Sequence, residues 1–164
     1  NSATGHLILS TLSSSSVLTA ISRLKDLGVD KYLLTEGLLG IVSQKLLRRL
    51  CSECKKEVLI SKNELIKHFS ESKKTIMSLP DDEIKIFEPT GCTHCMQSGY
   101  IGRICIAEFF QVDDKIRNMI EHDKSTIDIK EYLYSTGYKD IKSDALQKVL
   151  TGISSLDEVQ RVIQ

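Results

Sequence analysis

Cys51-Ser52-Glu53-Cys54 and Cys92-Thr93-His94-Cys95 are the two stretches that decide how this 164-residue chain folds. In each stretch two residues separate two cysteines, a spacing that lets both sulfurs of a tight turn face one ion. Two such turns supply the four thiolates of a closed tetrahedral site, and zinc is the usual ion in a site made only of sulfur ligands. The sequence therefore predicts a structural zinc site whose ligands are Cys51, Cys54, Cys92 and Cys95.

Other roles for these cysteines fit the sequence less well. A disulfide framework is typical of small, cysteine-dense chains, whereas this chain is longer and has five cysteines, an odd number. A redox C-x2-C motif would need a βαβ pattern beside it and would leave the second pair unexplained. A metal-dependent hydrolase needs an open coordination position for water, which four thiolates do not leave.

One further cysteine and two histidines lie near these pairs in the sequence. Cys105 stands in the apolar run Ile104-Cys105-Ile106-Ala107 and is expected to be a small buried hydrophobic residue. His94 lies inside the second cysteine pair and His68 in the connecting segment. We expect both histidines to be solvated, because four cysteines already complete the site.

Composition limits the classes of partner. Acidic and basic residues balance at 22 each, and no apolar run is long enough to span a bilayer. One possibility is a free-standing zinc-binding interaction module, for example one that binds nucleic acid. Such modules usually carry a basic patch and stacking aromatic residues. The chain has no net charge and no tryptophan, so nucleic acid is not the expected partner.

The segment before the first cysteine pair has an α/β pattern. Gly5-His6-Leu7-Ile8-Leu9 is apolar on both faces, which predicts a buried strand over residues 6–12. Such a strand needs neighbours on both edges, and too few candidates follow it. We therefore expect the chain to be the C-terminal piece of a longer protein.

Helices are predicted from capping residues and apolar spacing. One helix is expected after the serine run Ser13 to Ser16 and ends at Gly28. A second is expected over about 31–39, with Asp30 as its cap. Residues 41–50 fit a strand or a helix equally well.

The region from the first cysteine pair to the end is expected to divide in two. Residues 55–91 are lysine-rich and poor in large side chains, so they are not expected to form a core of their own. We therefore expect the folding of this segment to depend on the bound metal. Beyond the second pair, a strand and a helical tail are predicted. The expected elements are helices at 61–69 and 72–79 and strands at 84–87 and 103–110. Further helices are expected behind Asp113 or Asp114, from about 126 to 136, across Ala145, Leu146, Val149 and Leu150 as far as Gly152, and behind a second capping box, Ser155-Leu156-Asp157-Glu158.

Several segments, taken in order, resemble one family: the ATPases of type II secretion and type IV pilus assembly. They look like that family's histidine box, its tetracysteine motif with the strand beyond it, and its closing helices. The segments are Thr4-Gly5-His6-Leu7-Ile8-Leu9-Ser10-Thr11-Leu12, Gln44-Lys45-Leu46-Leu47-Arg48-Arg49-Leu50-Cys51-Ser52-Glu53-Cys54, Gly91-Cys92-Thr93-His94-Cys95, Gly99-Tyr100-Ile101-Gly102-Arg103 with Glu108, Asp144-Ala145-Leu146-Gln147-Lys148-Val149 and Gly152-Ile153-Ser154-Ser155-Leu156-Asp157-Glu158-Val159.

The resemblance implies an α/β fold: the end of a RecA-like P-loop NTPase domain (residues 1–50), a tetracysteine zinc subdomain (51–98), and a strand with a small helical C-terminal domain (99–164). It further implies a homo-hexamer at the cytoplasmic face of the inner membrane, with membrane platform proteins as partners and no insertion into the membrane. ATP and Mg²⁺ would belong to the full-length protein. The chain contains no G-x4-G-K-[ST] phosphate loop, so alone it is expected not to hydrolyse ATP.

The same resemblance suggests roles for two residues. His6 would be a catalytic residue that links the nucleotide state to the sheet; the alternative is a strand histidine whose two ring nitrogens are both hydrogen-bonded. Arg103 would face the nucleotide or a subunit boundary, where a guanidinium can bind phosphate with two hydrogen bonds; the alternative is a surface arginine or a partner for Glu108. Ser13 stands where the family usually has a second histidine, and Cys105 where it usually has glycine.

Two charged groups are interpreted as ordinary surface. Adjacent Arg48 and Arg49 are expected to form a solvated edge, and Asp81-Asp82-Glu83 is expected to be a solvated turn, because no matching ligand cluster accompanies it.

Overall fold

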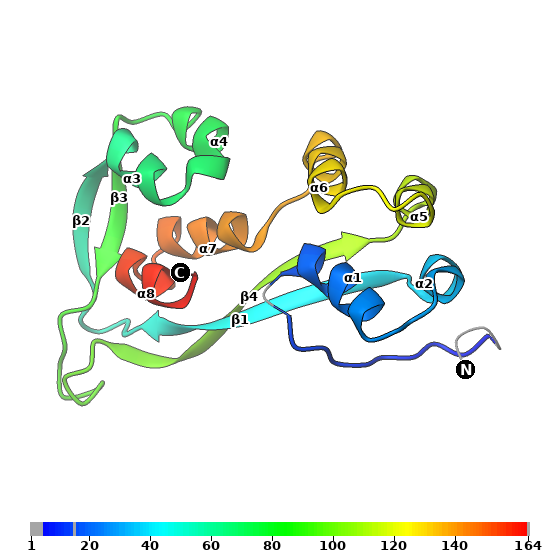
Figure 1. The fold of residues 1–164 in the computed structure, drawn as a ribbon. Coiled ribbons are helices and arrows are strands. Elements are labelled where there is room, and N and C mark those ends of the chain that lie inside the picture. The colour runs from blue at the N-terminus through cyan, green and yellow to red at the C-terminus, as the bar shows by residue number, and fades with distance from the viewer. Residues whose placement is uncertain (1–4, 15, 164) are drawn as a thin grey trace. The chain divides into compact units, whose positions relative to one another are not determined.

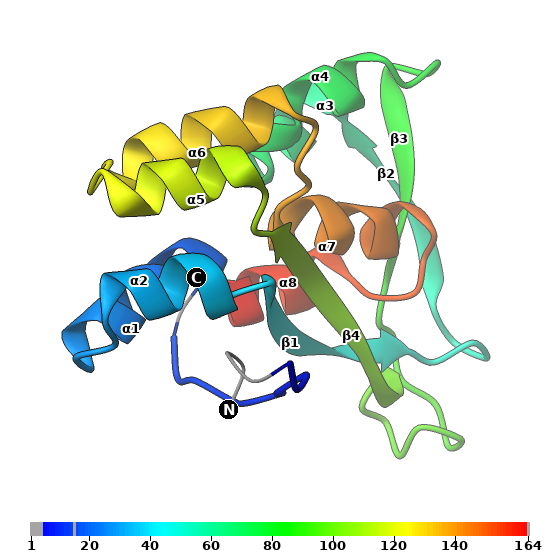
Figure 2. The ribbon, with the colours of Figure 1, turned by 90° about the vertical axis from the view of Figure 1, so that its right-hand side faces the viewer.

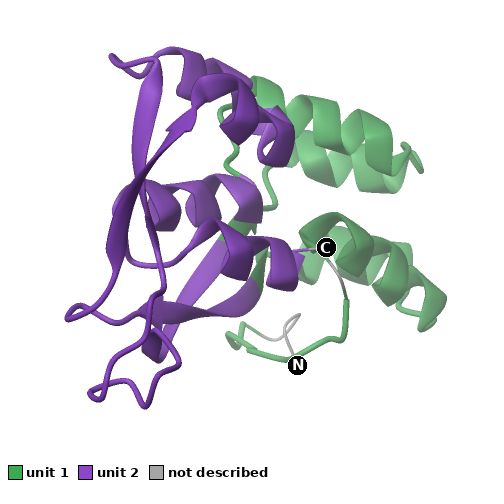
Figure 3. Ribbon diagram, turned by 90° about the vertical axis from the view of Figure 1, so that its left-hand side faces the viewer, with its two compact units in different colours: residues 1–43, 108–139 green, residues 44–107, 140–164 purple. Residues whose placement is uncertain are grey.

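The computed structural model describes residues 5–14 and 16–163 as an α/β protein with small sheets (Figure 1). The chain divides into two compact units (Figure 3). Unit 1 holds residues 1–43 and 108–139, and unit 2 holds residues 44–107 and 140–164. Each unit therefore joins two separate stretches of chain, whereas the sequence suggested three consecutive domains. Within the described ranges, no helix is long and apolar enough to cross a membrane.

Unit 1 is built mainly from helices that begin at polar caps. The Ser16 side chain accepts a hydrogen bond from the Thr19 amide, and the Thr19 side chain accepts one from the Ser16 amide. The Asp30 side chain accepts one from the Tyr32 amide at the start of the next helix. These caps confirm both helices predicted before the first cysteine pair. The helices are α1 (Val17–Asp26), α2 (Lys31–Gly37), α5 (Asp114–Glu121) and α6 (Thr126–Ser135). Their apolar faces form one core with Phe110 and Val112.

Polar side chains tie the helices of unit 1 together. Glu108 is buried, and its two carboxylate oxygens accept hydrogen bonds from the Val17 amide at 3.0 Å and from the Tyr138 hydroxyl at 2.8 Å. A negative charge at the first turn of α1 is favourable because helix N-termini carry a partial positive charge. On the surface, hydrogen bonds from Lys31 and Lys25 lower the pKa of Asp123 to about 2.

The buried strand predicted over residues 6–12 is wrong for the described structure. Residues 6–14 have no regular secondary structure, and Leu7 and Leu9 are 74% and 89% exposed. The physical reason is that no described strand pairs with this segment, and an unpaired strand has no hydrogen-bonding partner for its backbone. Thr4 and Ser15, which belong to the matched segment and the serine run, lie outside the described residues.

The described residues form two strand pairs. The long strands β1 (Gly40–Leu50) and β4 (Tyr100–Gln111) pair with each other, and each has residues in both units. In unit 2, β2 (Lys56–Ser61) pairs with β3 (Glu83–Glu88) in antiparallel fashion, with Val58 opposite Ile86. β1 settles the ambiguous segment 41–50 as a strand, and β3 confirms the strand predicted near 84–87.

The helices of unit 2 pack against the β2–β3 pair, with α7 beside β3 (Figure 2). They are α3 (Lys62–His68), the 3-10 turn η2 (Ser70–Ser72), α4 (Lys73–Met77), α7 (Ile141–Leu150) and α8 (Leu156–Ile163). The structure confirms the helices predicted at 61–69, across residues 145–150 and behind the capping box at 155–158. The buried core of this unit consists of Leu47, Leu65, Phe69, Ile76, Ile84, Ile86, Ile106, Ala145, Leu146, Val149 and Val159.

Residues 55–91 form no separate core, but the structure corrects the expectation that they are poor in large side chains for packing. The segment supplies Leu65, Phe69, Ile76, Ile84 and Ile86 to a core that it shares with the C-terminal helices. Sequence reasoning missed this because the five side chains are spread over α3, the residue that follows it, α4 and β3, and each of these elements alone is short.

A buried carboxylate joins the C-terminal helix to β1 and corrects the expectation that Arg48 is simply solvated. Glu158 is 1% exposed and accepts hydrogen bonds from the Arg48 backbone amide and guanidinium at 2.7–2.9 Å, and from the Arg161 guanidinium at 2.7 and 2.8 Å. Burial by itself would raise the pKa of Glu158, but the hydrogen bonds from Arg161 and Arg48 outweigh it and lower the pKa to about 2.

Glu158→Gln is expected to lower the free energy of unfolding by about 2–3 kcal/mol at pH 7, because the ionised carboxylate is the common acceptor for both arginines. The pKa of Glu158 is depressed in the folded state, so its contribution is complete above about pH 4.5 and disappears as the pH falls toward 2. Urea titrations of both proteins at pH 7, 5, 4 and 3 measure the difference.

The difference between the two proteins is the informative quantity, because acid also protonates other groups in both of them. It should shrink as the pH falls below 4.5. A difference that stays constant down to pH 3 would contradict the assignment.

Candidate metal centre

The four cysteines lie where the ends of the two strand pairs come together. Cys51 follows the last residue of β1, and Cys54 lies in the turn just before β2. Cys92 and Cys95 lie in the connection from β3 to β4. Since β1 pairs with β4 and β2 with β3, the two connections are brought to one place. The long segment between the two cysteine pairs holds β2, α3, α4 and β3.

The sulfur atoms have the spacing of a tetrahedral metal site. The Sγ–Sγ distances are 3.9 Å for Cys51–Cys92, 3.8 Å for Cys54–Cys95 and 3.7 Å for Cys92–Cys95, and all four sulfurs lie within 4.8 Å of one another. Metal–sulfur bonds of 2.3 Å in tetrahedral geometry place the sulfurs about 3.8 Å apart. A disulfide would bring two sulfurs to about 2.05 Å. The cluster therefore fits one metal ion and excludes pairwise disulfides, as the sequence predicted.

The surroundings of the sulfurs favour a thiolate at one end of the cluster. The backbone amides of Cys92 and Gly99 both donate to Cys95 Sγ at 3.2 Å. Burial acts to raise the pKa of the Cys95 thiol, but these amides and the neighbouring thiols lower it to about 6. Burial raises the pKa of Cys51 to about 11, so Cys51 needs a cation to become a thiolate.

Two glycines allow the second cysteine turn to close. Gly91 and Gly99 both have positive φ angles, +98° and +74°. A Cβ atom on Gly91 would lie 2.7 Å from the Gln97 carbonyl oxygen, and one on Gly99 would lie 2.4 Å from Pro89 Cβ. The turn is completed by the Gln97 amide, which donates to the Cys92 carbonyl at 2.8 Å. Only glycine fits these two positions without displacing the turn.

The remaining ligand candidates lie outside the cluster. His94 is exposed, as expected. His68 lies between Gln160, whose amide nitrogen is 2.7 Å from its Nδ1 atom, and Glu64, so it is part of the α3–α8 contact. Cys105 is exposed on β4, and its prediction as a buried residue is wrong. The alternation of β4 places its neighbour Ile106 in the core and Cys105 on the opposite face.

The residues suggested by the family resemblance are not part of this cluster. His6 lies in unit 1 and lines a groove of about 720 Å³ together with residues 7–9, 36–40 and Phe109. Arg103 is exposed on β4, and Ser13 is exposed in the segment before α1. The acidic turn Asp81-Asp82-Glu83 is exposed too, and no described histidine or cysteine joins it in a metal cluster.

Sequence reasoning missed the residues whose contacts fix the chain just before the first cysteine turn. The Arg48 guanidinium stacks 4.2 Å from the centre of the Tyr100 ring, and the Tyr100 hydroxyl lies 2.7 Å from Ser155 Oγ. The amides of Leu50 and Cys51 donate to the carbonyls of Ile153 and Gly99, both at 2.9 Å. The signal that was available, a capping box at residues 155–158, pointed only to the helix start and not to this contact.

Gly99→Ala is expected to weaken metal binding and to destabilise unit 2, whereas Gly102→Ala serves as the matched control. Both glycines have positive φ, so both substitutions carry the left-handed strain of about 1–2 kcal/mol. Only Gly99 would also place a methyl group against Pro89, whereas nothing lies within 4 Å of a Cβ on Gly102.

We expect Gly99→Ala to cost about 2 kcal/mol more than Gly102→Ala in the free energy of unfolding, and to raise the metal dissociation constant. Denaturant titrations and a competition assay with a chelating dye measure the two quantities. Equal losses in the two variants would show that the Pro89 contact is unimportant.

Comparison with known proteins supports the family suggested by the motifs. The sequence profile of the family described as "Type II/IV secretion system protein" matches residues 1–161. The chain is 37% identical to "Type II secretion system protein E" of Dickeya dadantii over 98% of its own length and 30% of that protein. It is 37% identical to "Type IV pilus assembly ATPase PilB" of Thermus thermophilus over 95% of its length and 17% of that protein. It is 35% identical to "Type II secretion system ATPase E" of Vibrio cholerae over 98% of its length and 30% of that protein.

The chain thus spans less than a third of the length of these relatives. On the match of nearly all of its residues to the family profile, the chain belongs to the type II/IV secretion system protein family.

Proposed function

We propose that the chain is the C-terminal part of an ATPase that powers type II secretion or type IV pilus assembly. The observation that carries the proposal is the family match over residues 1–161, together with relatives named as secretion and pilus ATPases. In this proposal residues 1–50 are the end of a RecA-like domain, 51–98 the metal subdomain and 99–164 the C-terminal domain. The whole protein would act as a hexamer at the cytoplasmic face of the inner membrane, next to membrane platform proteins.

The role of unit 2 in this ATPase would be structural. Its four sulfurs would hold one zinc ion through Cys51, Cys54, Cys92 and Cys95, and zinc supplies a fixed tetrahedral link without redox chemistry. Four thiolates leave no open position, so the ion would not activate water. The ion would instead fix the end of β1 to the start of β4 and would hold the β2–β3 pair in place.

Metal removal is expected to loosen unit 2. The isolated chain should bind one zinc ion, and treatment with a strong chelator should lower its melting temperature by roughly 10 °C or more, because metal binding to such a site is coupled to folding. Cys92→Ser should lose the ion and behave like the chelated protein. Elemental analysis and circular dichroism measure the two effects.

Cys105→Ser is the matched control, because Cys105 is an exposed cysteine outside the cluster. This variant should keep one zinc per chain and an unchanged melting temperature. Unchanged stability of the original chain after complete removal of the metal would overturn the structural role.

Arg103 offers a test of the ATPase proposal. In the full-length enzyme, Arg103→Ala is expected to lower kcat for ATP hydrolysis at least about tenfold, because removing a guanidinium that stabilises phosphate charge has effects of this size or larger. Arg103→Lys should restore only part of the activity, since lysine keeps the charge but not the two-point geometry.

Arg49→Ala removes a second exposed arginine of the same unit and should leave kcat unchanged. Phosphate release at saturating ATP measures all three variants, and the isolated chain should release none. Full activity in Arg103→Ala would remove Arg103 from the proposed nucleotide or subunit contact.

A further inference from the structure

The outer edge of β3 is an unfilled position in a sheet. β2 and β3 form a sheet of two strands, paired along their whole length. Each strand of an antiparallel pair directs alternate backbone groups away from its partner. Among the described residues, the backbone groups of β3 that face away from β2 make no hydrogen bond. Such an edge is a template for another strand.

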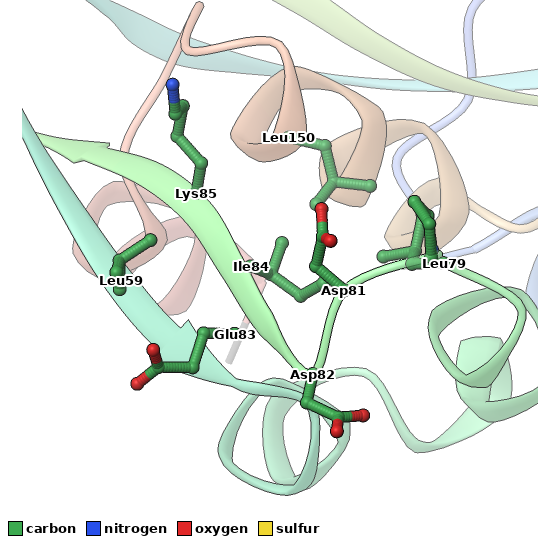
Figure 4. Close-up of a pocket in the computed structure, with 9 residues that line it drawn as sticks. Leu59, Leu79, Asp81, Asp82, Glu83, Ile84, Lys85 and Leu150 are labelled. Atoms are coloured by element: carbon green, nitrogen blue, oxygen red, sulfur yellow. The ribbon is translucent and has the colours of Figure 1, made fainter.

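A pocket of about 680 Å³ lies along this edge (Figure 4). Leu79 and Ile84 contribute apolar side chains from the turn and from β3, and Leu150 contributes one from the end of α7. Figure 4 shows the Asp81 carboxylate pointing toward Leu150, between Ile84 and Leu79. On the other face of the pair, Leu59 is 59% exposed. The edge thus offers apolar contacts for the side chains of an added strand.

The charges around the pocket are mostly negative and mostly uncompensated. Among the described residues, the carboxylates of Asp81 and Glu83 make no ion pair or hydrogen bond. The Asp82 side chain is fully exposed, and its Oδ1 atom lies 3.7 Å from Lys62 Nζ, which is long for an ion pair. Lys85 also lines the pocket, but its charge is paired with Glu57 at 3.0 Å. A partner with basic side chains would complement this surface.

We propose that the β3 edge and its acidic pocket bind an extended segment of another protein, in which aliphatic residues alternate with lysine or arginine. The segment would add to β3 as a third strand, so that its backbone pairs with the unpaired groups of β3. Its aliphatic side chains would enter the pocket beside Leu79 and Leu150, and its basic side chains would meet Asp81 and Glu83. A second copy of this chain is a poorer occupant, because pairing two β3 edges would bring their acidic residues together.

This interaction surface goes beyond the proposed ATPase function and does not depend on nucleotide. It lies entirely within unit 2. The test therefore uses the complete, zinc-loaded chain without ATP, and failure of one proposal leaves the other intact.

The probe is a fluorescent nine-residue peptide that alternates lysine and valine. We expect it to bind with a measurable change in fluorescence anisotropy, and to slow hydrogen exchange at the amides of residues 83–88. Two control peptides separate the contributions: one has glutamate in place of lysine, and the other carries N-methyl groups on alternate amides along one edge, which removes donors while keeping side chains and charge. Both should bind at least about tenfold more weakly.

Protein variants locate the site. Asp81→Lys and Glu83→Lys should each weaken binding of the lysine–valine peptide about five- to tenfold, because each reverses a charge at the pocket. Glu131→Lys makes the same change on α6 of unit 1, at an exposed residue, and should leave the affinity unchanged. Circular dichroism confirms that the variants remain folded.

Three results would overturn the proposal. Equal binding of the N-methylated peptide would rule out strand addition, and equal weakening by Glu131→Lys would show that only the overall charge matters. Sedimentation that reveals a dimer of the chain, abolished by Glu83→Lys, would assign the edge to a second copy instead.

Discussion

Convergence of four sulfur atoms is the constraint on which the arrangement of unit 2 depends. Two connections, one leaving β1 and one entering β4, must meet within 4.8 Å for the thiols to face one ion. Since β1 pairs with β4 and β2 with β3, this single point fixes both strand pairs at one end. The two ends of the segment between the cysteine pairs meet at the sulfur cluster, where a bound metal ion would join them into a closed loop. Loop closure of this kind removes conformational freedom from the unfolded chain, which is how a small unit gains stability from one link.

The sulfur site is not the only link at this place. The buried Glu158 accepts hydrogen bonds from Arg48, just before the first cysteine, and from Arg161 in its own helix. A buried carboxylate has a high desolvation cost, and here the two guanidinium groups, both partly exposed, offset it. The Tyr100 ring under Arg48 extends this contact to the start of β4. The strand ends that carry the cysteines are thus held from the C-terminal helix as well as by the sulfurs.

The sequence was most informative where one residue type has one physical use. The spacing of the cysteines predicted the cluster, and the capping residues Ser16, Asp30 and Asp113 mark helices that the structure contains. Predictions failed where the outcome depends on what a segment packs against. Cys105 was assigned to the core from its apolar neighbours, but the alternation of β4 turns it outward. The strand at 6–12 has the right pattern and no described neighbour to pair with, so its backbone stays outside any sheet.

Contacts between residues far apart in sequence could not be predicted, because they too depend on how the elements pack. In the sequence, Arg48 is one of two adjacent arginines and Glu158 is part of a helix capping box. Neither pattern indicates that Arg48 and Glu158 contact each other. Only the pairing of β1 with β4 and the packing of α8 bring them together. The same holds for the core of unit 2, because β2 and α3 each bring too few apolar residues to reveal a shared interior.

The contacts that stabilise the β2–β3 pair also explain how the outer edge of β3 can remain unpaired. An isolated pair of strands is marginally stable in water, and an edge that frays cannot serve as a template. Here α7 and α8 pack against β3, and the cysteine turns hold the chain just before β2 and just after β3. Because the pair is held in these two ways, neither strand needs a third strand for its own stability. The backbone groups along the edge of β3 can therefore remain unpaired in a rigid sheet, which lowers the entropic cost of adding a partner strand.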